Sequence, residues 1–146
     1  MQERYTGKDS FGELLGAEIL AADDDRVKVR AVVCPEHTNA YGTAHGGFLY
    51  SLADVAFAKA SNTEEVGGVA INTHMESYRP AEVGEALIAK SRGENVAKRL
   101  ATYRIEVRRE QDAALIASFT GMAYLLRNEP TASPISNNAG TESREQ

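Results

Sequence analysis

Apolar and polar positions alternate with two different periods along the 146-residue chain, and each period predicts its own kind of element. Residues 10–16 predict a short helix with Ser10 as N-cap, Glu13 completing a capping box and Gly16 as the stop. From 47 to 62 apolar side chains point in nearly every direction around a helix. This pattern predicts a buried helix roughly 24 Å long.

The other apolar segments predict strands of an antiparallel sheet. Residues 103–108 alternate between apolar and charged side chains, which is the period-two pattern of a half-buried strand. Turn-forming residues separate the segments, among them the aspartates at 23–25 and the pair Glu94-Asn95. One long helix on one face of such a sheet gives an α+β fold. The expected strands cover residues 17–22, 27–33, 67–78, 85–92, 99–109 and 113–126.

Composition places these elements in a single globular domain over residues 1–127. The chain is 42% apolar and 25% charged, within the ordinary range for a folded domain. Beyond it, residues 128–146 are rich in polar and small residues, with Ile135 as the one strongly apolar side chain, and a flexible tail is expected. The single cysteine, Cys34, and the polar first residues favour a reducing cytoplasm. No stretch is long and apolar enough for a membrane span.

The charge distribution restricts the partners. A net charge of -5 argues against nucleic acid as a ligand. Basic residues nevertheless gather between 90 and 109, where they would suit a compact phosphorylated molecule or simply form the solvated face of two strands. Since one helix leaves sheet edges and apolar surface uncovered, a homodimer is expected.

Asp54 is the most informative single residue. It lies in the middle of the predicted buried helix, between Ala53 and Val55. Burying a carboxylate is unfavourable unless it is paired or hydrogen-bonded, so the position indicates a partner, a wet cleft or a subunit boundary. The alternative is a stripe of helix that faces solvent.

The start of the same helix carries a second group of candidates. Asn39 and His45 precede Gly46 and Gly47, and two glycines at a helix start are expected to leave backbone N–H groups uncovered where the helix dipole is positive. Such an end would stabilise an oxyanion, with Asn39 or His45 orienting the reacting group. An ordinary glycine turn into a helix would have the same sequence. The three histidines lack metal-ligand spacing, so no metal is expected. A Walker loop and a dinucleotide fingerprint are also missing from the sequence.

Together these residues form a pattern that resembles a known family, the PaaI-like (phenylacetate-degradation type) acyl-CoA thioesterases of the hotdog fold. The resemblance extends from about residue 12 to residue 126. The first part of the pattern is Asn39, followed after a gap of five residues by His45-Gly46-Gly47-Phe48. Two residues later comes Ser51-Leu52-Ala53-Asp54, and Ala56 follows after one more residue. The motif Arg79-Pro80-Ala81 completes the pattern.

The resemblance implies a fold, a reaction and an assembly. The fold is an antiparallel sheet wrapped around one long central helix. The reaction is hydrolysis of an acyl-CoA or aryl-acyl-CoA thioester, with the carbonyl bound by the Gly46 amide and positioned by Asn39 and His45. Asp54 of the neighbouring subunit acts as nucleophile or general base, and homodimers commonly pair into tetramers.

One position departs from the family pattern. Many members carry Ser or Thr where this chain has Ala70, and that hydroxyl helps hold the attacking water. Strict strand alternation would place Asn72 and His74 on the same face as Ala70, so Asn72 is the candidate replacement.

For CoA, the resemblance points to cations near the sheet edge in addition to Gly47 at the helix start. The candidates are Arg79, Lys98 and Arg99, which could equally be solvated strand ends. A non-catalytic acyl-CoA-binding module and a hydratase on the same fold stay as alternatives. The preferred acyl group is open.

Overall fold

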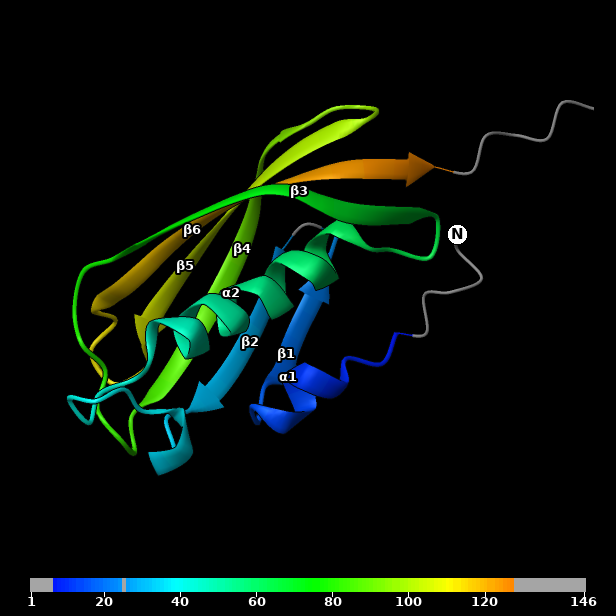
Figure 1. The fold of residues 1–146 in the computed structure, drawn as a ribbon. Helices are drawn as coiled ribbons and strands as arrows, with labels where there is room; N and C mark the ends of the chain where they lie inside the picture. The colour runs from blue at the N-terminus through cyan, green and yellow to red at the C-terminus, as the bar shows by residue number, and fades with distance from the viewer. Residues whose placement is uncertain (1–6, 25, 128–146) are drawn as a thin grey trace, which may run out of the picture.

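The computed structural model describes residues 7–24 and 26–127, and one curved sheet with a long helix in its concave side makes up most of that region (Figure 1). The predicted tail over 128–146 lies outside the described residues. In chain order the elements are α1 (Ser10–Leu14), β1 (Glu18–Asp23), β2 (Arg26–Val32), the 3-10 helix η2 (Pro35–His37), α2 (Gly46–Ser61), β3 (Val66–Ser77), β4 (Ala86–Val96), β5 (Leu100–Arg109) and β6 (Leu115–Arg127).

In the described part of the chain the sheet has six strands in the order β1-β2-β4-β5-β6-β3, and each neighbouring pair is antiparallel. Strands β4, β5 and β6 form the predicted meander, and β3 crosses over to pair with β6. This crossing leaves β3 at one edge and β1 at the other. The predicted α+β architecture, with a sheet wrapped around one helix, is confirmed (Figure 1).

The core lies between α2 and the concave face of the sheet. Leu52, Ala53 and Ala56 of α2 are fully buried. The Phe57 ring packs edge-on against Tyr103, with ring centroids 5.8 Å apart, and at a tilt against Phe119. Because α2 is buried on most of its sides, residues 46–61 show no clear amphipathic pattern in the sequence.

Gly121 on β6 leaves room for the Phe57 ring. A Cβ at this glycine would lie 2.8 Å from two atoms of the ring. We therefore expect Gly121→Ala to destabilise the fold by about 1–3 kcal/mol through overpacking. Urea unfolding measures this, with Gly67→Ala as the matched control, because the nearest atom to a Cβ at that strand glycine is 3.9 Å away. Equal losses in both variants would contradict the packing argument.

Two predicted boundaries are wrong in detail. The N-cap of α1 is Asp9, not Ser10, because the Asp9 side chain accepts a hydrogen bond from the Gly12 N–H and its backbone is extended. The pair Glu94-Asn95 does not end a strand either. A β-bulge between Gly93 and Asn95 absorbs the irregularity, and β4 continues to Val96.

No helix within residues 7–24 and 26–127 is long and apolar enough to cross a membrane.

Candidate functional site

The loop before α2 is built around the Asn39 side chain. Its Oδ1 accepts hydrogen bonds from the backbone N–H groups of Tyr41 (2.9 Å) and Thr43 (3.2 Å), and its Nδ2 donates to Thr43 Oγ1 (3.1 Å). The Ala44 N–H donates to the Ala81 carbonyl, which ties the loop to the segment after β3. Asn39 thus fixes the shape of the loop that enters the helix.

His45 is the N-cap of α2. Its Nδ1 accepts a hydrogen bond from the Gly47 N–H at 2.8 Å, while its carbonyl accepts from Phe48 and Leu49. The expectation that both glycine amides are uncovered is therefore wrong for Gly47. Once a histidine occupies the cap position, its ring nitrogen satisfies this donor.

The Gly46 amide, by contrast, remains available. No residue in the described part of the chain accepts a hydrogen bond from it. A Cβ at this position would meet nothing within 4 Å, so there is open space beside the Gly46 Cα. An N–H without a partner among the described residues, at the positive end of a 16-residue helix, is able to bind a partial negative charge.

A cleft of about 390 Å³ lies next to this amide. Three of the predicted residues, Asn39, Gly46 and Arg79, line it together. The rest of the lining comes from Thr43, Ala44, Leu49, Ser77, Tyr78 and Pro80.

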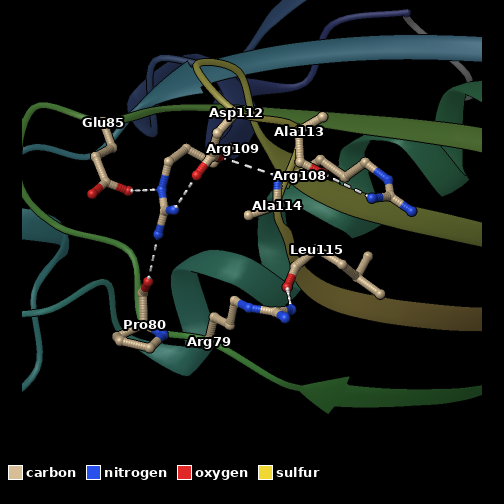
Figure 2. A network of polar contacts seen from close by, with 9 residues as sticks. All are labelled: Arg79, Pro80, Glu85, Arg108, Arg109, Asp112, Ala113, Ala114 and Leu115. Atoms are coloured by element: carbon tan, nitrogen blue, oxygen red, sulfur yellow. Dashed lines mark hydrogen bonds and ion pairs between the residues drawn. The ribbon is translucent and has the colours of Figure 1, made fainter.

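Arg79 is held at the edge of this cleft by a network that also involves Arg109 (Figure 2). Its Nη1 donates to the Leu115 carbonyl at 3.0 Å. Arg109 pairs with Glu85 (2.6 Å) and Asp112 (2.9 Å) and reaches the Pro80 carbonyl at 3.3 Å. From the sequence, Arg109 was only one of the basic residues between 90 and 109. The structure shows that it holds one wall of the cleft.

Asp54 lies half-buried on α2, away from the cleft lining. Among the residues described, none forms a hydrogen bond or an ion pair with its carboxylate. Burial raises the pKa of Asp54 above its usual range, and the nearby negative charge of Asp9 raises it further. Asp54 comes eight positions after Gly46 on the helix, which is roughly 12 Å along the axis. One chain alone therefore does not bring the two groups to the same carbonyl carbon.

A β-bulge in β3 changes which side chains face α2. Ala70 lies opposite Ala123 on the helix side, but the register shifts between Ala70 and Asn72, and Asn72 lies opposite Met122 on the outer face. The prediction that Ala70 and Asn72 share a face is wrong, because the extra residue inverts the alternation. His74, opposite Thr120, also points outward.

The bulge brings a hydroxyl to the helix side that the sequence analysis missed. Thr73 lies opposite Gly121, and its Oγ1 is 2.9 Å from the Tyr50 hydroxyl on α2. Tyr50 leans edge-on against Phe119, with ring centroids 5.3 Å apart. Because Tyr50 is one turn before Asp54 on α2, this hydroxyl pair borders the exposed stripe of the helix that carries the carboxylate.

The cations predicted to bind CoA do not gather within one chain. Arg79 contacts the beginning of β6, whereas Lys98 and Arg99 contact its end through Arg127 and Leu125. β6 has 13 residues, so these positions are about 40 Å apart. Of the three, Arg79 is the one that lines the cleft.

No group of three or more His, Cys, Asp or Glu within residues 7–24 and 26–127 is placed to hold a metal ion.

Residues 41–116 match the sequence profile of the thioesterase superfamily. The chain belongs to this superfamily. It is 46% identical over 117 residues to a putative esterase of Deinococcus radiodurans, covering 80% of each protein, and 31% identical over 116 residues to the acyl-coenzyme A thioesterase PaaI of Escherichia coli, covering 80% of this chain and 82% of that protein.

The fold agrees with this membership. A mutant of the phenylacetic acid degradation protein PaaI from Thermus thermophilus superposes with a TM-score of 0.77 at 42% identity, covering 81% of this chain and 100% of that one. The predicted PaaI-like family and hotdog fold are confirmed for this thioesterase-superfamily member.

Proposed function

We propose that this superfamily member hydrolyses acyl-CoA or aryl-acyl-CoA thioesters to the free acid and CoA, without a cofactor. The observation that carries the proposal is the Gly46 N–H at the start of α2, which has no acceptor among the described residues and lies next to a cleft of about 390 Å³. The relative named acyl-coenzyme A thioesterase PaaI supports the thioester as the substrate class.

In the proposed complex, the thioester carbonyl oxygen accepts a hydrogen bond from the Gly46 amide. When a nucleophile attacks the carbonyl carbon, this oxygen gains negative charge, and the N–H and the dipole of α2 stabilise that charge most strongly in the transition state. His45 keeps the helix start in shape through its bond to Gly47, and Asn39 keeps the preceding loop in shape. Both residues act by positioning the amide.

Asp54 supplies the second half of the chemistry from a neighbouring subunit. Its carboxylate is half-buried without a partner among the described residues of its own chain, and it is too far along α2 to reach a carbonyl at Gly46 of that chain. A second copy that brings its α2 alongside would remove both difficulties. We therefore propose a homodimer as the smallest active unit, and pairing of dimers into tetramers is compatible with it.

The edge strand β3 supports this assembly. β3 has 12 residues, and its sheet neighbour is β6 on one side only. Val69 (46% exposed) and Ile71 (55% exposed) lie on this edge strand. A long edge with exposed apolar residues favours pairing with another strand, and two β3 strands related by a two-fold axis would extend the sheet.

The reaction balances in either of two ways. If Asp54 is a general base, its carboxylate takes a proton from water as the water oxygen bonds to the carbonyl carbon. The C–S bond then breaks and releases CoA thiolate, which is protonated. With Asp54 as nucleophile, its oxygen displaces the thiolate to give a mixed anhydride that water hydrolyses. Arg79 is the cation on the cleft that we propose for the CoA phosphates.

Free-thiol release from a panel of aromatic and straight-chain acyl-CoAs tests the function. Turnover of at least one member is expected, and the panel ranks the acyl groups. Tight binding of acyl-CoA without any thiol release would overturn hydrolysis and favour an acyl-CoA-binding module. Loss of the acyl-CoA substrate without thiol release would indicate a different reaction, such as hydration.

A further inference from the structure

Most charged side chains of the sheet point away from α2. Residues directly opposite each other on paired strands share a face, so Glu18 opposite Arg30 and Lys90 opposite Glu106 lie together on the outer surface. Two arginines share the helix-side face, Arg109 opposite Leu87 and Arg127 opposite Val66, and both lie at the last positions of their strands. The buried side chains on this face are uncharged, among them Val29, Ala89, Ile105 and Phe119. Neither arginine contributes to the raised pKa of Asp54, so a charge that affects this carboxyl has to come from elsewhere.

Helix α1 brings one such charge. It packs on α2 through the buried Gly12, where a Cβ would lie 2.8 Å from Asp9 Oδ2 and 3.2 Å from Val55 Cγ2. Gly12 thus lies between the Asp9 carboxylate and Val55, the residue that follows Asp54. The Oδ1 of Asp9 accepts a hydrogen bond of 2.9 Å from the Gly12 N–H, which fixes the position of the carboxylate. A side chain at residue 12 would separate the two helices.

We propose that Asp9 is a positioning residue for the reaction described above: its fixed negative charge, held where α1 docks on α2, makes the Asp54 carboxylate a better proton acceptor. The inference rests on the proposed role of Asp54. A carboxylate surrounded by apolar side chains and a second carboxylate takes up a proton more readily than one in water. A general base works best when its pKa is close to the pH at which the enzyme operates.

The electrostatics agree with the geometry. Asp9 is the one charged group that, besides burial, raises the pKa of Asp54. Within residues 7–14 and 45–61, the other charged or titratable groups are Lys8, Glu13, His45, Tyr50 and Lys59, and none of them is a cause of the raised pKa of Asp54. Glu13 carries the same charge as Asp9 on the same helix and so offers a matched comparison.

The experiment compares pH profiles of kcat/KM for the full-length parent, Asp9→Asn and Glu13→Gln. Asparagine caps a helix about as well as aspartate, so Asp9→Asn removes the charge and keeps the cap. We expect the acidic limb of the kcat/KM profile of Asp9→Asn to shift to lower pH, by roughly half a pH unit at low ionic strength and by less in 1 M salt. The Glu13→Gln limb is expected to stay with the parent. Carboxyl ¹³C NMR titration, with Asp54 assigned through Asp54→Asn, measures the same shift without turnover.

The outcomes separate this proposal from the proposed function. An unchanged acidic limb and NMR titration in Asp9→Asn would overturn the role of Asp9 while leaving hydrolysis through Asp54 intact. An equal shift in Glu13→Gln would also overturn it, because the effect would then belong to net charge. If Asp54→Asn itself keeps the parent rate, the proposed function of Asp54 fails, and the NMR titration alone decides the Asp9 contact.

Discussion

Replacing Asp54 with asparagine is expected to lower kcat for thioester hydrolysis by a factor of roughly 10² to 10⁴. The amide has nearly the same shape as the carboxylate, but it neither accepts a proton at neutral pH nor attacks a carbonyl. In the structure the Asp54 carboxylate has no partner among the described residues, so the substitution breaks no ion pair there. Steady-state thiol release with saturating acyl-CoA measures the change. A variant that kept more than a tenth of the parent rate would exclude both proposed roles.

The same variant should be more stable than the parent at neutral pH, which distinguishes lost chemistry from lost folding. Burial and Asp9 raise the pKa of Asp54 in the folded chain. A carboxyl with a raised folded pKa binds more protons folded than unfolded, so stability falls as pH rises from its unfolded value through its folded value. Above that window the charged carboxylate destabilises the fold, and asparagine removes this term. Urea midpoints at pH 7 should therefore rise in Asp54→Asn, and the difference should shrink below the unfolded pKa.

The sequence predicted the fold well because burial periodicity and turn residues act locally. Each predicted strand and the long helix appear within a few residues of their expected limits. Asp54 stood out for the same reason, since a carboxylate among apolar neighbours is visible without a structure. The pairing of β3 with β6 depends on contacts far apart in the sequence, and neither periodicity nor turn residues predicted it.

The wrong predictions about the site have a common cause. Each concerned a detail that depends on one hydrogen bond or on one inserted residue. Gly47 was expected to offer its amide, but the His45 ring nitrogen takes it. Asn72 was expected beside Ala70, but one bulged residue turned it outward and turned Thr73 inward. Alternation counts residues and does not detect a bulge.

The Gly46 amide gives the second large effect. Gly46→Pro removes its N–H while keeping the helix, because proline is well tolerated at the first helical position. His45 before it has φ -61 and ψ 140, the extended conformation that a residue preceding proline adopts. We expect kcat to fall roughly 10² to 10³-fold, as when one oxyanion donor is lost. Gly46→Ala is the matched control, since it keeps the N–H and its Cβ meets nothing within 4 Å. Equal losses in the two variants would argue against the amide as donor.

Combining the two defects tests whether the site is shared between subunits. If each site uses Gly46 of one chain and Asp54 of the other, a dimer of one Asp54→Asn chain and one Gly46→Pro chain contains one intact site and one doubly defective site. Such mixed dimers, co-expressed with two tags and purified through both, should recover about half of the parent rate, although each variant alone is nearly inactive. If both groups acted within one chain, every site would carry a defect and mixing would restore nothing. Recovery would thus explain why a half-buried carboxylate without a partner among the described residues is retained about 12 Å along the helix from the amide it serves.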